Sequence, residues 1–200
     1  MKKITLLTLL LIPCMSYSQT IQEYYALFEH SFRKTLENSE TNQVMVNEKN
    51  AFLRISNPQK PADVVSFKYF VKADQRKVFG FQYADIQEGL NLVILRTEFY
   101  VYQDKKWLEV TEEVCPLLTL KDFWGNQALP TQVSQEFNLE LILPETNTTI
   151  LAKSQPAVAV QFPYGNLPTG YSETFEKRKF KTIELNWNKT TGKFEVGKKY

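Results

Sequence analysis

The sequence predicts a mostly β protein of the α+β class, in which an antiparallel sheet meander carries one N-terminal helix packed on it. Three observations support this fold class. Apolar and polar residues alternate over most of the chain, short polar turns separate the alternating segments, and one helical pattern stands near the start. Hydrophobic residues make up 43% and aromatic residues 14% of the chain, which suffices for a packed core and excludes disorder.

The first 18 residues have the pattern of a secretory signal peptide. Lys2 and Lys3 give a positive start, residues 4–12 form an apolar run, and the small residues Ser16 and Ser18 precede a cleavage site. The apolar run is shorter than the ~20 residues that span a bilayer. We therefore expect an exported protein, periplasmic or secreted, with no transmembrane segment after cleavage.

Cys14 raises the alternative of a lipid anchor, because lipoprotein signals also end in a cysteine after a short apolar run. The residue before such a cysteine is normally small, whereas here it is Pro13. The sequence therefore favours cleavage without lipidation. Residues 19–200 contain no linker rich in glycine, serine or proline, and we expect them to form a single β-rich domain.

Removal of the leader changes the charge balance and the cysteine count. The whole chain has 24 basic and 22 acidic residues, and the leader takes two lysines, which leaves 22 against 22. A neutral chain argues against nucleic acid as a partner, since phosphate binding needs a basic face. Only Cys115 remains, so we expect no internal disulfide.

The helical pattern begins at Thr20, which forms a predicted capping box with Glu23. A stripe of apolar residues follows at helical spacing and is predicted to pack on the sheet, with the helix ending near Asn38. The stripe consists of Ile21, Tyr24, Tyr25, Phe28 and Phe32.

The strands that follow are predicted from period-two alternation, with one buried face each. The expected strands are Val65–Val71, Phe79–Tyr83, Val93–Val101, Phe137–Leu143, Thr149–Ala152, Val158–Phe162 and Phe180–Trp187. Polar turns at Ala73–Gln75, Gln103–Lys105 and Asn188–Gly192 indicate hairpins. The crowded apolar segment Cys115–Pro130 is expected to hold a short helix that crosses between two portions of the sheet.

Two hairpin segments resemble each other as strand, polar turn and aromatic return. They are Tyr102–Trp107 and Asn186–Phe194. This similarity suggests two similar halves that arose by duplication, although hairpins share such chemistry in general.

Few residues can carry catalysis, and we predict no catalytic residue, metal ligand or cofactor. The only histidine, His30, is expected to face solvent opposite the apolar stripe, which disfavours a histidine-based triad or metal site. Cys115 lies between apolar neighbours and is expected to be a buried, inert thiol. Glu112 and Glu113 are adjacent and do not form a carboxylate pair by themselves, although distant acids could still assemble a glycosidase site.

The loop from Phe162 to Tyr171 is the candidate ligand-binding segment, because it combines aromatic residues, prolines, glycines and an amide. Tyr164, Asn166 and Tyr171 suit a sugar or a peptide. In the alternative interpretation, the loop is a rigid connection whose aromatic rings cover the sheet.

The function that the sequence favours is an exported binding or envelope-associated module, whose partner is an unidentified glycan, peptide or envelope protein. One alternative is a hydrolase that cleaves extracellular glycan with carboxylates from distant strands. Another is a structural envelope protein that binds only other proteins. The sequence leaves open whether the chain is an enzyme and favours a non-catalytic role.

Overall fold

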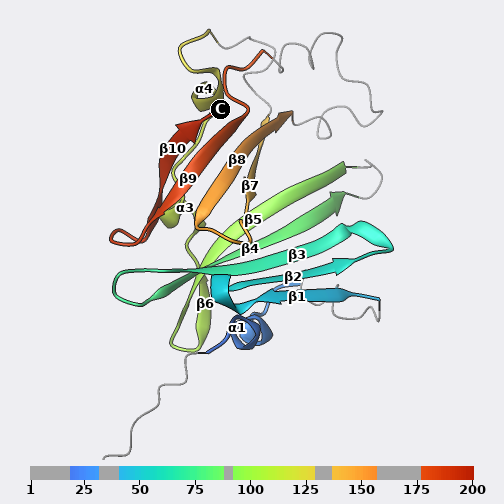
Figure 1. Cartoon of the computed structure of the whole chain (residues 1–200). Coiled ribbons are helices and arrows are strands. Elements are labelled where there is room, and N and C mark those ends of the chain that lie inside the picture. The colour runs from blue at the N-terminus through green and yellow to red at the C-terminus, as the bar shows by residue number, and fades with distance from the viewer. Residues whose placement is uncertain (1–18, 32–40, 88–91, 129–136, 157–176) are drawn as a thin grey trace, which may run out of the picture.

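The computed structural model describes residues 19–31, 41–87, 92–128, 137–156 and 177–200 (Figure 1). Several predictions from the sequence fall outside these residues and stay predictions. They are the signal peptide with Cys14, the apolar residue Phe32, the strand Val158–Phe162 and the candidate binding residues Tyr164, Asn166 and Tyr171.

The described residues form two antiparallel sheets in which consecutive strands are neighbours, so the predicted mostly β meander is confirmed. The six-stranded sheet comprises β1 (Gln43–Asn47), β2 (Phe52–Asn57), β3 (Lys60–Val71), β4 (Lys77–Gln87), β5 (Leu92–Gln103) and β6 (Lys106–Glu109). The four-stranded sheet comprises β7 (Phe137–Ile142), β8 (Thr149–Pro156), β9 (Thr182–Asn188) and β10 (Lys193–Lys199). The proposed duplication stays a hypothesis.

Short helices connect and cover the sheets. They are α1 (Ile21–Leu27), the 3₁₀ helix η1 (Glu48–Asn50), α3 (Thr111–Val114) and α4 (Leu120–Trp124). Helices α3 and α4 lie between β6 and β7; α4 is the short helix predicted within Cys115–Pro130, whereas α3 precedes that segment and was not predicted. No helix among the described residues is long and apolar enough to cross a membrane.

The predicted hairpins between strands β3 and β4, β5 and β6, and β9 and β10 are all present. Asp104 and Lys105 both have positive φ angles, of 51° and 61°, as a two-residue turn between twisted strands requires. Gly192 has a φ of 68° at the end of the β9–β10 turn, a conformation that glycine adopts without steric cost.

Helix α1 begins as predicted but ends earlier. The Glu23 backbone N–H donates to Thr20 Oγ1 at 3.2 Å, and Thr20 N–H donates to Glu23 Oε2 at 2.8 Å, so the capping box is confirmed. The helix ends at Leu27 rather than continuing toward Asn38. The Trp107 indole N–H donates to the Leu27 carbonyl at 2.9 Å, which satisfies a backbone group left open where the helix stops.

The central strands β3 and β4 of the six-stranded sheet are buried on both faces, which corrects the expectation of one buried face per strand. In β3, Val65 and Phe67 lie on one face and Ser66, Lys68 and Phe70 on the other, and all five are buried. Figure 1 shows the reason: helix α1 lies on one side of this sheet and the four-stranded sheet lies on the other.

The two sheets share one apolar core. Its largest members are aromatic, with Phe70 and Phe99 from the six-stranded sheet and Trp187 and Phe194 from the other. A Cβ atom at Gly80 would lie 2.8 Å from Leu143 Cδ2, so the absence of a side chain on β4 allows the chain after β7 to pack closely.

Candidate functional site

Three hairpins converge at one end of the molecule and enclose a cleft of about 580 Å³, here called the hairpin cleft. Its walls come from the β3–β4 turn, the end of β5, the β9–β10 turn and α3, and Tyr24 of α1 closes one side. In Figure 1 the β3–β4 and β9–β10 hairpins extend side by side on the left, and the β5–β6 hairpin points downward. The cleft is therefore assembled from segments far apart in the sequence.

Backbone and indole hydrogen bonds hold these hairpins against each other. The Ala73 N–H in the β3–β4 turn donates to the Lys189 carbonyl in the β9–β10 turn at 2.8 Å. The Trp187 indole N–H donates to the Val71 carbonyl at 3.0 Å. A site on hairpins fixed in this way is preorganised, which lowers the entropy lost when a ligand binds.

Aromatic rings form one wall of the hairpin cleft. The ring centroid of Tyr24 lies 4.7 Å from that of Phe79 and 6.3 Å from that of Tyr102. Lys77 Nζ lies 4.6 Å from the Tyr24 ring centroid and 4.9 Å from that of Tyr69, and it donates a hydrogen bond to the Tyr24 hydroxyl at 3.3 Å. The ammonium is thus held beside flat aromatic faces by cation–π contacts.

The charges of the hairpin cleft are mostly positive. Its basic residues are Lys72, Arg76, Lys77 and Lys193, whereas Glu113 is the one acidic residue among the described lining residues. Lys72 lies against Gly192, where an added Cβ would come within 2.5 Å of Lys72 Cε. The cleft therefore offers aromatic faces together with an excess of cations.

Arg76 is partly neutralised at the cleft rim by an ion pair with Asp74, with Arg76 Nη2 2.6 Å from Asp74 Oδ2. The hydrogen bonds from Arg76 lower the pKa of the Asp74 carboxyl group, which therefore stays charged. Both side chains are exposed, so water screens this pair, and Lys72, Lys77 and Lys193 carry most of the uncompensated charge.

A second cavity of about 300 Å³, here called the Lys68 cavity, lies between η1, the end of β3, the β7–β8 loop and the end of β9. Lys68 lines it and is only 2% exposed. Lys68 Nζ donates to the Asn50 carbonyl at 2.8 Å and lies 5.9 Å and 5.8 Å from the ring centroids of Phe52 and Phe70. Burial lowers the pKa of Lys68 to about 8, and the nearby Glu145 carboxylate opposes this shift.

His30 is not solvent-facing, which corrects the prediction from its helical angle. The helix ends before it, and its ring packs against Phe81 and Tyr83 at centroid distances of 4.8 Å and 5.2 Å. His30 Nε2 lies 3.3 Å from Glu98 Oε2, and the Glu98 carboxylate also accepts a hydrogen bond from the Tyr83 hydroxyl at 2.8 Å. The early end of α1 therefore places His30 in a polar cluster beneath the helix.

Tyr100 completes this cluster by donating a hydrogen bond from its hydroxyl to Glu98 Oε2 at 2.5 Å. Burial and then the hydrogen bond to Glu98 raise the pKa of the Tyr100 hydroxyl. Glu98 thus accepts bonds from two tyrosines and contacts the histidine, so these groups stabilise one another. The arrangement anchors the segment after α1 to strands β4 and β5.

Cys115 is a free, partly buried thiol, and burial raises its pKa to about 12. Since the thiolate is the reactive form, this environment fits the predicted inert thiol. Within the described parts of the chain, no group of three or more histidine, cysteine, aspartate or glutamate side chains could hold a metal ion.

The candidate binding residues that the sequence favours, Tyr164, Asn166 and Tyr171, lie outside the described residues, and the structure does not test them. Sequence reasoning missed the hairpin cleft and the Lys68 cavity. Each hairpin turn is recognisable in the sequence, but nothing in the pattern indicates which turns meet.

No known protein family matches the sequence. No curated protein matches it either. Among solved structures, the fold is similar to a domain of an uncharacterized protein from Porphyromonas gingivalis W83. The TM-score is 0.54 at 13% sequence identity, and the match covers 77% of this chain and 74% of the other. At this level of identity the similarity shows a shared fold and does not extend to activity.

Proposed function

We propose that this chain is an exported binding module that holds an acidic glycan in the hairpin cleft. The observation that carries the proposal is a preformed cleft of about 580 Å³ whose wall is aromatic and whose described lining has four basic residues and one acidic residue. Export is inferred from the signal-peptide pattern of the first 18 residues.

The chemistry of the cleft supports an acidic sugar over other ligands. Tyrosine rings provide a flat apolar face and a polar hydroxyl, which suit the C–H face and the hydroxyl groups of a sugar ring. Lysine and arginine side chains form charge-assisted hydrogen bonds with carboxylate groups. An acidic glycan provides both kinds of group in one ligand.

The same lining favours binding over hydrolysis. Glycosidases generally use two carboxyl groups, about 5–5.5 Å apart in retaining and about 6.5–9.5 Å apart in inverting enzymes. Glu113 is the one carboxylate among the described residues that line the hairpin cleft, and Glu48 is the one in the Lys68 cavity. Neither cavity supplies a carboxylate pair from the described part of the chain.

The test is calorimetric titration of residues 19–200 with a galacturonic acid oligosaccharide. We expect binding that weakens as salt is raised, because exposed ionic contacts are screened. Lys193→Glu should weaken binding by at least about tenfold, equal to 1.4 kcal/mol. Lys60→Glu is the matched control, since Lys60 is also exposed but starts β3, at the opposite end of that strand from the β3–β4 turn.

Binding of a neutral oligosaccharide with equal affinity would contradict the role of the cations. Equal losses in Lys193→Glu and Lys60→Glu would also contradict the proposal, because they would indicate general charge attraction rather than a cleft. Cleavage of the oligosaccharide during the titration would favour the hydrolase instead.

One observation favours assembly with other proteins as a second candidate function. Strand β1 lies at the edge of the six-stranded sheet, and its residues Val44 and Met45 are 58% and 40% exposed to solvent. An exposed edge can accept a strand from another chain. The strand has only five residues, however, and short edge strands are a common protection against such pairing. Val44→Lys should abolish any self-association seen by analytical ultracentrifugation if β1 is the interface.

A further inference from the structure

We propose that Lys68 forms the base of a second binding site, separate from the hairpin cleft, which takes the carboxylate group of one small molecule. The site is the Lys68 cavity, and its argument uses none of the basic residues that carry the proposed glycan site. The two proposals can therefore fail independently.

The first observation is the incomplete hydrogen bonding of a buried ammonium group. Lys68 is 2% exposed, and its Nζ has one hydrogen-bond acceptor in the described structure, the Asn50 carbonyl at 2.8 Å. An ammonium group has three N–H donors. The ring faces of Phe52 and Phe70, nearly 6 Å away, stabilise the charge without accepting those donors as an oxygen would.

The second observation is the lack of a paired counter-ion. No carboxylate in the described part of the chain lies within 4.0 Å of Lys68 Nζ, although Glu145 is near enough to favour its charged form. Buried charges in proteins are normally paired, because removing an ion from water is costly. Burial accordingly lowers the pKa of Lys68 to about 8, yet the group remains mostly protonated at neutral pH.

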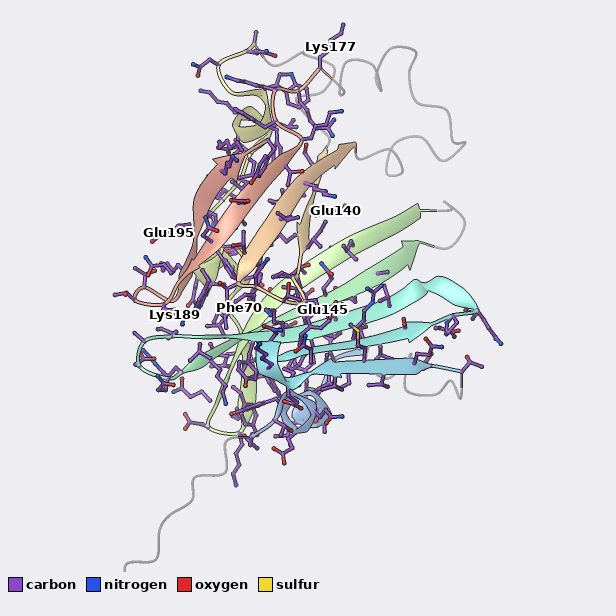
Figure 2. The ribbon with its side chains drawn as sticks, in the orientation of Figure 1. Phe70, Glu140, Glu145, Lys177, Lys189 and Glu195 are labelled. Atoms are coloured by element: carbon purple, nitrogen blue, oxygen red, sulfur yellow. The ribbon has the colours of Figure 1, made fainter. Side chains whose placement is uncertain are left out.

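The third observation is the space beside this ammonium. The cavity holds about 300 Å³, at the small end of ligand sites. Phe70 and Trp187 supply apolar walls, and Thr146 and Thr148 on the β7–β8 loop supply hydroxyl groups. In Figure 2, Phe70 lies between Lys189 and Glu145 at the level where the two sheets meet. The cavity thus resembles a small aromatic-lined site with a cation at its base.

These features point to a carboxylate. It would accept the two remaining N–H groups of Lys68 and compensate its charge, while the rest of the molecule would contact the apolar walls. Lys49 and Lys189 add positive charge to the lining and Glu48 adds one negative charge, so the described lining favours an anion.

The probe is benzoate, and benzamide is its uncharged control of nearly the same shape. In calorimetric titrations at pH 7 we expect benzoate to bind and benzamide to bind at least about tenfold more weakly, or 1.4 kcal/mol. Lys68→Met should abolish the preference for benzoate. Equal affinity for benzoate and benzamide would overturn the proposal. Binding of inorganic phosphate with the same affinity as benzoate would also overturn it, since the cavity would then be a general oxyanion site.

Glu145→Gln provides a second variant that leaves Lys68 in place. Glu145 is exposed, so the substitution should be tolerated in the fold. Removing its negative charge should tighten benzoate binding severalfold. Unchanged or weaker binding would show that benzoate does not bind within the electrostatic field of Glu145 beside Lys68, and this result would contradict the proposal.

The pH dependence supplies an independent readout. Because Lys68 must be charged, the affinity of the wild type for benzoate should fall by about tenfold between pH 7 and pH 9. Other titratable groups around the cavity are Glu48, Lys49, Tyr69, Glu145 and Lys189. Lys68→Met retains all of them and should show no such fall. A parallel fall in both proteins would assign the effect to those groups and contradict the role of Lys68.

Discussion

The two faces of the six-stranded sheet are covered by different elements and buried in different ways. Under α1, the centre of the face is a cluster of aromatic rings that includes Phe28, Phe67 and Phe81, and the polar cluster of His30 and Glu98 lies beside it. On the face toward the four-stranded sheet, the buried groups include the polar side chains of Lys68 and Gln82. Both described cavities lie where the β9–β10 hairpin of the four-stranded sheet meets the six-stranded sheet.

This difference separates the centre of the α1 face, which stabilises the fold, from its hairpin end, where Tyr24, Phe79 and Tyr102 line the hairpin cleft, and from the junction between the sheets. At the centre of the α1 face, the rings of Phe28, Phe67 and Phe81 pack together and exclude water, so substitutions at these three positions should act on stability alone. The other face uses polar contacts to join the sheets. Gln82 Nε2 and Thr97 Oγ1 both donate to the Leu141 carbonyl at 2.5 Å. Such polar junctions leave gaps and charges that a ligand can use.

The largest effect is expected from Phe28→Ala on the aromatic face. Phe28 is 1% exposed, and its ring lies 4.9 Å from those of Phe81 and Trp107. Truncation should lower the free energy of unfolding by about 3–5 kcal/mol in chemical denaturation. Leu27→Ala is the control, because Leu27 is 42% exposed, and it should cost less than about 1 kcal/mol. Equal effects would mean that α1 is not docked through Phe28.

A smaller effect is expected from Gln82→Met on the polar junction. The substitution keeps the length of the side chain but removes the donor to Leu141 O and Thr97 Oγ1. We expect a loss of about 1–3 kcal/mol in chemical denaturation, because buried polar groups lose a partner. Gln43→Met, at an exposed position of β1, should change stability by less than about 0.5 kcal/mol. An unchanged free energy of unfolding in Gln82→Met would show that these polar contacts do not stabilise the junction between the sheets.

The charge of Lys68 should make the free energy of unfolding depend on pH, with a change of about 1 kcal/mol between pH 7 and pH 9. The folded protein releases the Lys68 proton near pH 8, whereas the unfolded chain holds it to about pH 10.5, so the unfolded state binds more protons in between. The stability of the wild type relative to Lys68→Met should therefore rise from pH 7 to pH 9. The raised pKa of Cys115 acts in the opposite direction above pH 9, but it is common to both proteins and cancels. A difference that stays flat or falls would contradict the lowered pKa of Lys68.

The smallest effect is expected from redox conditions. Cys115 is free and is the one cysteine of residues 19–200. Thermal unfolding curves of this segment with and without reductant should superimpose. Its raised pKa should also make labelling by a thiol reagent slow at pH 8 until the protein unfolds. Rapid labelling of the folded protein would show that the thiol is less buried than the structure indicates.

The fold class could be predicted because each hairpin is encoded locally, by alternation and by turns such as Asp104–Lys105. The burial of both faces could not. Ser66, Lys68 and Gln82 occupy the polar positions of alternating strands, a pattern typical of a solvated face. Their burial depends on partners elsewhere in the chain, such as the Asn50 carbonyl for Lys68.

The same limit applies to the candidate sites. The hairpin cleft brings Tyr24 together with Lys77, Tyr102 and Lys193, which no local pattern relates. The prediction that His30 faces solvent was wrong because it assumes helical geometry beyond Leu27. The chain leaves the helix there and buries Phe28. Long-range packing decided both outcomes.

The most direct test of the central claim, that ligands bind at the junction of the two sheets, is an NMR titration of the ¹⁵N-labelled protein with a galacturonic acid oligosaccharide. The account predicts that amide shifts change in the β3–β4 and β9–β10 turns, at Lys72–Lys77 and Thr191–Lys193, and not at Leu53 and Ile55 beneath α1. Changes confined to strands β1 and β2, or the absence of any change at saturating ligand, would contradict it.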